Sequence, residues 1–164
     1  MARYVTVTLQ QRAVSCRVEL LDAQAPVTCD AVWEVLPVTG DAVHAKFARN
    51  EVYALVPRIT QAPRRENPTV TPIPGDVCLF DFEPWEINNP AFGYEPGSEA
   101  YAAQGATDLA LFYGRNNLLI NGDVGWVPGN VFGTVVDGFE QMAVACNDLW
   151  RNGFVGEHLT FARD

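Results

Sequence analysis

The chain has 164 residues and a mass of 18.0 kDa, a length that suits one domain with a sizeable core. Eleven Lys and Arg residues stand against twenty Asp and Glu residues, so the formal net charge is −9 at pH 7. This charge argues against binding to nucleic-acid phosphates or to an anionic membrane surface. No apolar run approaches the roughly 18 residues that a membrane-spanning helix needs. We therefore expect neither a nucleic-acid partner nor a membrane partner.

The N-terminus and the cysteines predict a cytoplasmic location. Residues 1–9 alternate apolar and polar side chains and lack the unbroken apolar core of a signal peptide. The four cysteines are far apart in the sequence and form no CxxC pair: Cys16, Cys29, Cys78 and Cys146. A chain of this length does not need disulfides for its stability, so we expect reduced and mostly buried thiols.

Two antiparallel hairpins separated by a helix are predicted in the first third of the chain. Four strands follow from the alternation of apolar side chains: residues 4–9, 13–20, 42–47 and 51–56. Residues 26–36 fit a short helix between the hairpins. Proline is tolerated in a first helical turn, and the proline that follows this segment ends the helix.

The remaining chain alternates between strands and irregular segments. Residues 58–72 are polar and rich in proline, which is typical of a connection. Further strands are predicted at residues 77–82, 109–113 and 131–136. The apolar spacing that begins near residue 138 predicts a C-terminal helix over 138–153. We expect the residues after it, including His158, to form a surface tail.

Together these elements predict a mainly β fold. We expect a closed or nearly closed β-barrel of about eight strands, capped by two helices, in a single domain over residues 1–164. Residues 83–107 carry prolines, glycines and aromatic side chains, and they are predicted to form a loop inserted into this barrel. A loop of that length inside a small domain is usually functional or an assembly arm.

The negative charge of the chain is concentrated around that loop. Between Arg65 and Arg115 there is no Lys or Arg, whereas eight carboxylates lie there: Glu66, Asp76, Asp81, Glu83, Glu86, Glu95, Glu99 and Asp108. One interpretation is a solvated acidic loop, and the other is an acidic lid or rim over a site. Such a lid would repel anionic ligands unless a cation lay beneath it.

Five segments, taken in order, resemble the small bacterial cyclophilin-like superfamily. They are the helix at 26–37, the strand at 51–57, the Pro-Gly-Asp-Val strand entry at 74–77, the strand end at 109–115 and the segment at 128–133. The resemblance covers roughly residues 4–138. It is to an uncharacterised branch of unknown function, with an inserted acidic loop and a C-terminal helix. It implies a cyclophilin-like barrel.

The resemblance does not imply prolyl isomerase activity. That chemistry needs an arginine to weaken the resonance of the prolyl amide, a glutamine to hold the peptide and an apolar pocket for the ring. Arg49 and Phe47 can be fitted to this pattern. The nearby glutamines, Gln61 and Gln104, lie in predicted loops without the required neighbours.

The main catalytic candidates lie on the second predicted hairpin. His44 and Glu51 occupy its two strands, where cross-strand neighbours approach to about 4.5–5.5 Å between Cβ atoms. A glutamate there would fix the tautomer of the imidazole, which would act as a general acid or base near neutral pH. Arg49 and Tyr53 are predicted to bind substrate, since arginine can hold a carboxylate through two parallel hydrogen bonds. A purely structural histidine is the alternative.

A second candidate cluster ends the predicted strand at 109–113. Tyr113 and Arg115 would hold a small anionic substrate at the mouth of the barrel. The acidic aromatic loop would close over it with Glu83, Trp85 and Tyr94. The alternative is an ordinary hairpin turn that carries a solvated arginine.

Two functions remain open from the sequence. The first is a small-molecule enzyme, namely a hydrolase, lyase or isomerase of a carboxylated amide-type metabolite, with no metal and no other cofactor. The second is a non-catalytic ligand-binding or assembly module whose aromatic loop packs on another subunit. A homo-oligomer is expected in either case, because a cluster of exposed aromatic side chains is a liability on a monomer.

Overall fold

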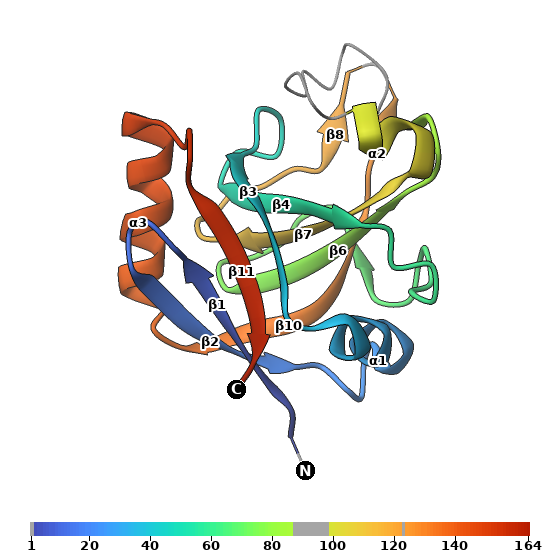
Figure 1. The fold of residues 1–164 in the computed structure, drawn as a ribbon, viewed down its shortest axis with the longest axis horizontal. Coiled ribbons are helices and arrows are strands. Elements are labelled where there is room, and N and C mark those ends of the chain that lie inside the picture. Colours follow the sequence, from blue (N-terminus) through green and yellow to red (C-terminus); the bar gives the residue numbers. More distant parts are fainter. Residues whose placement is uncertain (1, 87–98, 123) are drawn as a thin grey trace.

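The computed structural model describes residues 2–86, 99–122 and 124–164, and eight strands among them close into an antiparallel barrel (Figure 1). Around the barrel they are β2 (Val14–Leu20), β1 (Tyr4–Leu9), β11 (His158–Arg163), β3 (Val38–His44), β4 (Glu51–Pro57), β7 (Ala106–Phe112), β6 (Asp76–Phe82) and β10 (Gly129–Asp137). Pairing of β10 with β2 closes the circle. The prediction of a mainly β, closed barrel is confirmed.

Shorter strands and the helices lie around the eight barrel strands. A short strand, β5 (Pro68–Thr69), pairs with β10, and β8 (Ile120–Asn121) pairs with β9 (Gly125–Trp126) in a separate ribbon. The described helices are α1 (Pro26–Val35), α2 (Glu99–Gln104) and α3 (Phe139–Asn152). Figure 1 shows α1 and α3 on different sides of the barrel, and each buries one face in its interior. The two predicted helices are therefore present.

The strands bury side chains on both faces, so the molecule has two apolar clusters. The interior cluster takes alternate side chains from all eight barrel strands and from α1 and α3. The outer cluster lies on the opposite face of β4, β6 and β7, beneath loop residues such as Leu119 and Val127. In β4, Val52 and Ala54 face the interior, whereas Tyr53 faces the outer cluster. Both faces of these central strands are therefore buried from solvent.

The connection at 58–72 is fixed to α1 by a carboxylate. Glu66 accepts hydrogen bonds from the backbone N–H groups of Val27 and Thr28 at 3.0 and 2.8 Å, and from Thr28 Oγ1 at 2.7 Å. The first N–H groups of a helix have no partner within the helix, so this side chain completes the N-terminus of α1.

The structure differs from the sequence expectations in two elements. The predicted tail after residue 153 contains β11, which pairs with both β1 and β3 and completes the barrel. Leu159 and Phe161 of β11 are fully buried, while His158 lies at the surface with Nδ1 3.1 Å from Asp41 Oδ1. The predicted loop at 83–107 ends in α2 and in the first residues of β7, and much of the rest of it lies outside the described residues.

The described helices include none that is long and apolar enough to cross a membrane. All four cysteines are free and buried. Burial raises the pKa of Cys16 to about 12, so this thiol stays protonated at neutral pH.

Candidate functional site

The two predicted catalytic residues lie on opposite faces of the β3–β4 hairpin. His44 pairs with Val52, whose side chain faces the barrel interior. Glu51 precedes Val52 in the strand, so its side chain points to the outer face. The expected contact between His44 and Glu51 is therefore wrong, because directly paired residues share a face and their sequence neighbours do not.

His44 is bound within a small buried cluster of its own. Its Nδ1 lies 3.0 Å from the carbonyl oxygen of Ala45, and its Nε2 lies 2.7 Å from Tyr113 Oη. Because a carbonyl can only accept, Nδ1 carries the proton and Nε2 accepts from the tyrosine. Burial lowers the pKa of His44, although the bond to Ala45 opposes this effect. The ring also lies against Trp150 of α3, with centroids 5.0 Å apart.

Glu51 instead shares the outer face with Asp108, a residue that sequence reasoning counted only among the acidic charges. Each of the two carboxyl groups belongs to a residue that is only 5% exposed. Burial raises the pKa of Glu51 to about 8. Burial, followed by the negative charge of Glu51, raises the pKa of Asp108 well above its ordinary value. Both groups therefore favour the protonated form at neutral pH.

Asp108 lies among apolar side chains that offer it few hydrogen-bonding groups. Its Oδ1 atom is buried and has no hydrogen-bond partner among the described residues. Its cross-strand neighbours are Leu55 on β4 and Phe80 on β6. Along β7 the same face carries the small side chains of Ala106 and Ala110. A buried carboxyl oxygen without a partner is costly, and such a cost is typical of functional sites.

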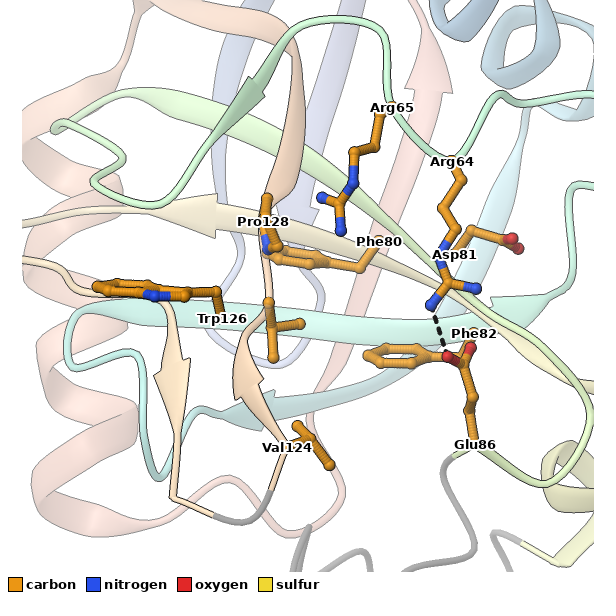
Figure 2. Close-up of a pocket in the computed structure, with 10 residues that line it drawn as sticks. Arg64, Arg65, Phe80, Asp81, Phe82, Glu86, Val124, Trp126 and Pro128 are labelled. Atoms are coloured by element: carbon orange, nitrogen blue, oxygen red, sulfur yellow. Dashed lines mark hydrogen bonds and ion pairs between the residues drawn. The ribbon is translucent and has the colours of Figure 1, made fainter.

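A cavity of about 200 Å³ opens beside β6 (Figure 2). Phe80 and Phe82 of β6 line it from the barrel, Trp126 and Pro128 line it from the β8–β9 region, and Arg65 reaches in from the connection at 58–72. Since Phe80 is the cross-strand neighbour of Asp108, a single side chain separates the carboxyl from the cavity lining. The cavity therefore lies next to the strand position that pairs with Asp108, although Asp108 itself does not line it.

A glycine makes room for the aromatic side of this cavity. A Cβ atom on Gly129 would lie 2.6 Å from Phe80 Cζ and 3.2 Å from Cys78 Cβ. The phenyl ring can occupy its position only because residue 129 has no side chain. Gly129, the first residue of β10, thus helps to determine the shape of the cavity, a role that its sequence alone did not reveal.

The charges around the cavity are mostly paired. Asp81 accepts two hydrogen bonds from Arg58, at 2.8 and 2.9 Å, in the bidentate geometry that arginine favours. Glu86 lies 2.6 Å from Arg64, as the dashed line in Figure 2 shows. Within the described part of the chain, no carboxylate forms an ion pair with Arg65. The guanidinium of Arg65 is directed toward Phe80 and Pro128 (Figure 2).

The other residues nominated from the sequence are spread over several parts of the molecule. Tyr53 lies on the outer face, buried beside Glu51. Glu83 and Trp85 are exposed, and the remainder of the predicted lid, including Tyr94, lies outside the described residues. Arg49 and Arg115 are exposed on two neighbouring turns, which are joined by a 2.7 Å bond from Asn50 Nδ2 to the Arg115 carbonyl. Neither arginine lines the cavity.

Comparison with solved structures identifies two proteins of similar fold. McbB, in a structure titled as its complex with tryptophan, matches 98% of this chain at 17% identity with a TM-score of 0.63. The match covers 44% of the McbB chain, so this chain spans less than half the length of McbB. The hypothetical protein AF2241 from Archaeoglobus fulgidus matches 99% of this chain and 95% of its own, at 18% identity and a TM-score of 0.52. These likenesses show the fold alone.

A comparison with curated protein sequences found no significant match. Residues 7–161, nearly the whole chain, match the family described as "Protein of unknown function (DUF3830)". The chain therefore belongs to the DUF3830 family, whose fold in this member is a closed barrel with a buried carboxyl pair on its outer face.

Proposed function

We propose that this protein is a small-molecule enzyme that uses Glu51 and Asp108 for proton transfer on the outer face of β4 and β7. The observation that carries the proposal is the buried Oδ1 atom of Asp108, which has no hydrogen-bond partner in the described chain and lies one side chain from a cavity. A group held in this way retains its capacity to bind a substrate atom.

The raised pKa values suit this role. A carboxyl group whose pKa lies near or above neutral keeps a proton that it can donate, and it becomes a strong base once that proton has left. The charge of Glu51 disfavours ionisation of Asp108, so both groups begin as proton donors at neutral pH, and a carboxylate becomes the base only after its proton has been given to the substrate. Hydrolysis, elimination and isomerisation of an amide-type metabolite can each use a group that donates a proton and then takes one back.

Among the residues nominated from the sequence, Glu51 and Tyr53 belong to this site. We assign His44 and Tyr113 a structural role, because each satisfies the other in a partly buried hydrogen bond at the barrel end. Glu83, Trp85, Arg49 and Arg115 are proposed only as outer contacts of a ligand, since none of them lines the cavity.

The test compares isosteric variants of the two carboxyl residues. Wild type, Asp108→Asn and Glu51→Gln would each be incubated with a metabolite extract, and compound depletion would be followed by mass spectrometry. We expect wild type to convert at least one compound, and each variant to lose at least about 100-fold in rate. Asp137→Asn, a surface change at the end of β10, is the matched control and should retain activity. Undiminished conversion by both site variants would refute the proposal.

A binding or assembly module is the second candidate, and one observation favours it. Apolar side chains are exposed around the β8–β9 ribbon: Leu118, Ile120, Val124 and Trp126. A cluster of this kind is typical of a contact surface, which supports the expected homo-oligomer. Sedimentation equilibrium of wild type and Ile120→Ser tests the assembly role. A wild-type oligomer that Ile120→Ser dissociates would support it, and a wild-type monomer would refute it.

The expectations from the sequence about the domain, its location and prolyl isomerisation are also proposals. We propose that residues 1–164 act as one cyclophilin-like domain in the cytoplasm, and the free cysteines support the reducing compartment. Prolyl isomerisation is the weaker alternative activity, because neither Arg49 nor Phe47 lines the cavity. A standard proline-isomer assay on a short peptide tests it, and measurable acceleration would restore this alternative.

A further inference from the structure

We infer that the cavity beside β6 binds a single-ring planar carboxylate, with the anion on Arg65 and the ring between Phe80 and Trp126. This inference names the substrate class of the proposed enzyme and rests on the proposed function wherever it concerns turnover. The binding itself is argued from the cavity alone: its unpaired cation, its aromatic lining and its size.

The anion is assigned from the local charges. Arg58 and Arg64 already bind Asp81 and Glu86 at hydrogen-bond distance. Arg65 has no ion-pair partner in the described residues, although its guanidinium projects into the same cavity (Figure 2). A guanidinium carries donors in a fork that matches the two oxygens of a carboxylate. A negatively charged ligand is therefore the group that Arg65 is placed to receive.

The flat ring is assigned from the walls. Phe80 and Phe82 present aromatic side chains from β6, and Trp126 of β9 is part of the same lining, on the far side of Pro128 from Phe80 in Figure 2. Trp126 is 57% exposed, so a large apolar side chain is left uncovered at the edge of the cavity. Aromatic pairs gain attraction beyond the burial of their area, which favours a planar partner over an aliphatic one of equal size.

Size limits the ligand to one ring. The cavity holds about 200 Å³, below the range of about 300–1,000 Å³ that is usual for drug-sized ligands. A ligand whose ring lay against Phe80 would also lie next to the strand position of Asp108. The ring or a substituent close to it would then be the part exposed to proton transfer.

Binding can be measured on the full chain with simple probes. Benzoate would be titrated at neutral pH by calorimetry and by two-dimensional NMR, with benzamide as the neutral analogue and cyclohexanecarboxylate as the non-planar analogue. We expect benzoate to bind in the micromolar to millimolar range, and both analogues to bind at least about 10-fold more weakly. NMR shifts should centre on the indole of Trp126.

Variants separate the roles of the two walls. Arg65→Met should weaken benzoate binding at least about 10-fold, whereas Arg151→Met on exposed α3 should leave it unchanged. Trp126→Ala should weaken the binding of benzoate, and benzamide should still bind only weakly to this variant. No saturation by benzoate up to about 10 mM, or equal affinity in wild type and Arg65→Met, would overturn the inference.

Asp108→Asn keeps this result distinct from a failure of the proposed function. If the inference holds, Asp108→Asn binds benzoate as wild type does, because Arg65 and the aromatic walls are intact. Binding that depends on Arg65, together with metabolite turnover that ignores Asp108, would support the inference and refute the enzyme mechanism. Turnover that depends on Asp108 without any Arg65-dependent binding would support the mechanism and refute the inference.

Discussion

Replacing Glu51 by glutamine is expected to stabilise the folded protein in mildly alkaline solution and to leave its stability almost unchanged in mild acid. Burial raises the pKa of Glu51 from 4.5 to about 8. Between these values the unfolded chain releases the proton while the folded chain keeps it, so wild-type stability falls as the pH rises. Glutamine has nearly the same shape and cannot ionise, so the variant escapes this loss.

The magnitude follows from the change in pKa. A rise from 4.5 to about 8 corresponds to about 5 kcal/mol of unfolding free energy between these two pH values. Relaxation of the apolar wall around an ionised carboxylate makes this figure an upper bound. After burial, the charge of Glu51 is the second cause that raises the pKa of Asp108, so its removal also eases the ionisation of Asp108. This adds to the stabilisation of the variant.

Guanidinium unfolding at about pH 5, 7 and 9 measures the effect, with the free energy of unfolding extrapolated to water at each pH. Glu34→Gln, an exposed change of the same type on α1, is the matched control and should follow wild type. The gain of Glu51→Gln over wild type should grow from about pH 5 to about pH 8 and then level off. Parallel curves for wild type and Glu51→Gln from about pH 5 to 9 would refute the account of Glu51 as a buried acid.

Three further predictions concern the scaffold. Burial lowers the pKa of His44 in the folded protein, so this histidine is protonated first in the unfolded chain as the pH falls below 6.5, and the folded protein loses stability. His44→Gln should therefore lose less stability than wild type in acid unfolding between about pH 6.5 and 5, and an equal loss contradicts this. Glu66→Ala should cost about 1 kcal/mol by leaving the first N–H groups of α1 without partners, seen as a lower denaturation midpoint, and an unchanged midpoint contradicts it. Glu157→Ala should cost about 3 kcal/mol, because this fully buried carboxylate binds Arg12 at 2.9 Å and accepts from the Gln11 N–H at 2.7 Å; a loss under about 1 kcal/mol in the same assay contradicts it.

The fold was largely predictable because alternation and turn residues are local signals. The strands predicted at 4–9, 13–20 and 51–56 and the two long helices lie close to their predicted positions, whereas the strand predicted at 42–47 runs over Val38–His44 instead. β11 was missed because it is short and its partners, β1 and β3, lie far away in the sequence. Its alternation of buried Leu159 and Phe161 with polar residues was a usable signal.

The site was harder to predict because it depends on register and on tertiary contacts. Assigning Glu51 and Tyr53 to one face of β4 needs only the period of a strand. Whether Glu51 shares a face with His44, however, depends on the register of β3 against β4, in which His44 pairs with Val52. A shift of one residue in this register would place the two side chains on the same face. Asp108 could have been noticed as a charged residue inside an apolar strand. Arg65 and Trp126 line the same cavity only because two separate segments, the connection at 58–72 and the β8–β9 ribbon, lie over β6. No local sequence pattern reveals this arrangement.

The proposed chemistry depends on Glu51 and Asp108 both being protonated at neutral pH. Carbon-13 NMR of protein labelled at the Asp and Glu carboxyl carbons, with Glu51→Gln and Asp108→Asn to assign the two signals, measures this directly. We expect Glu51 to carry its proton at about pH 7 and to titrate near pH 8, with Asp108 still protonated in the same range. Both signals at their ionised positions by about pH 6 would contradict it.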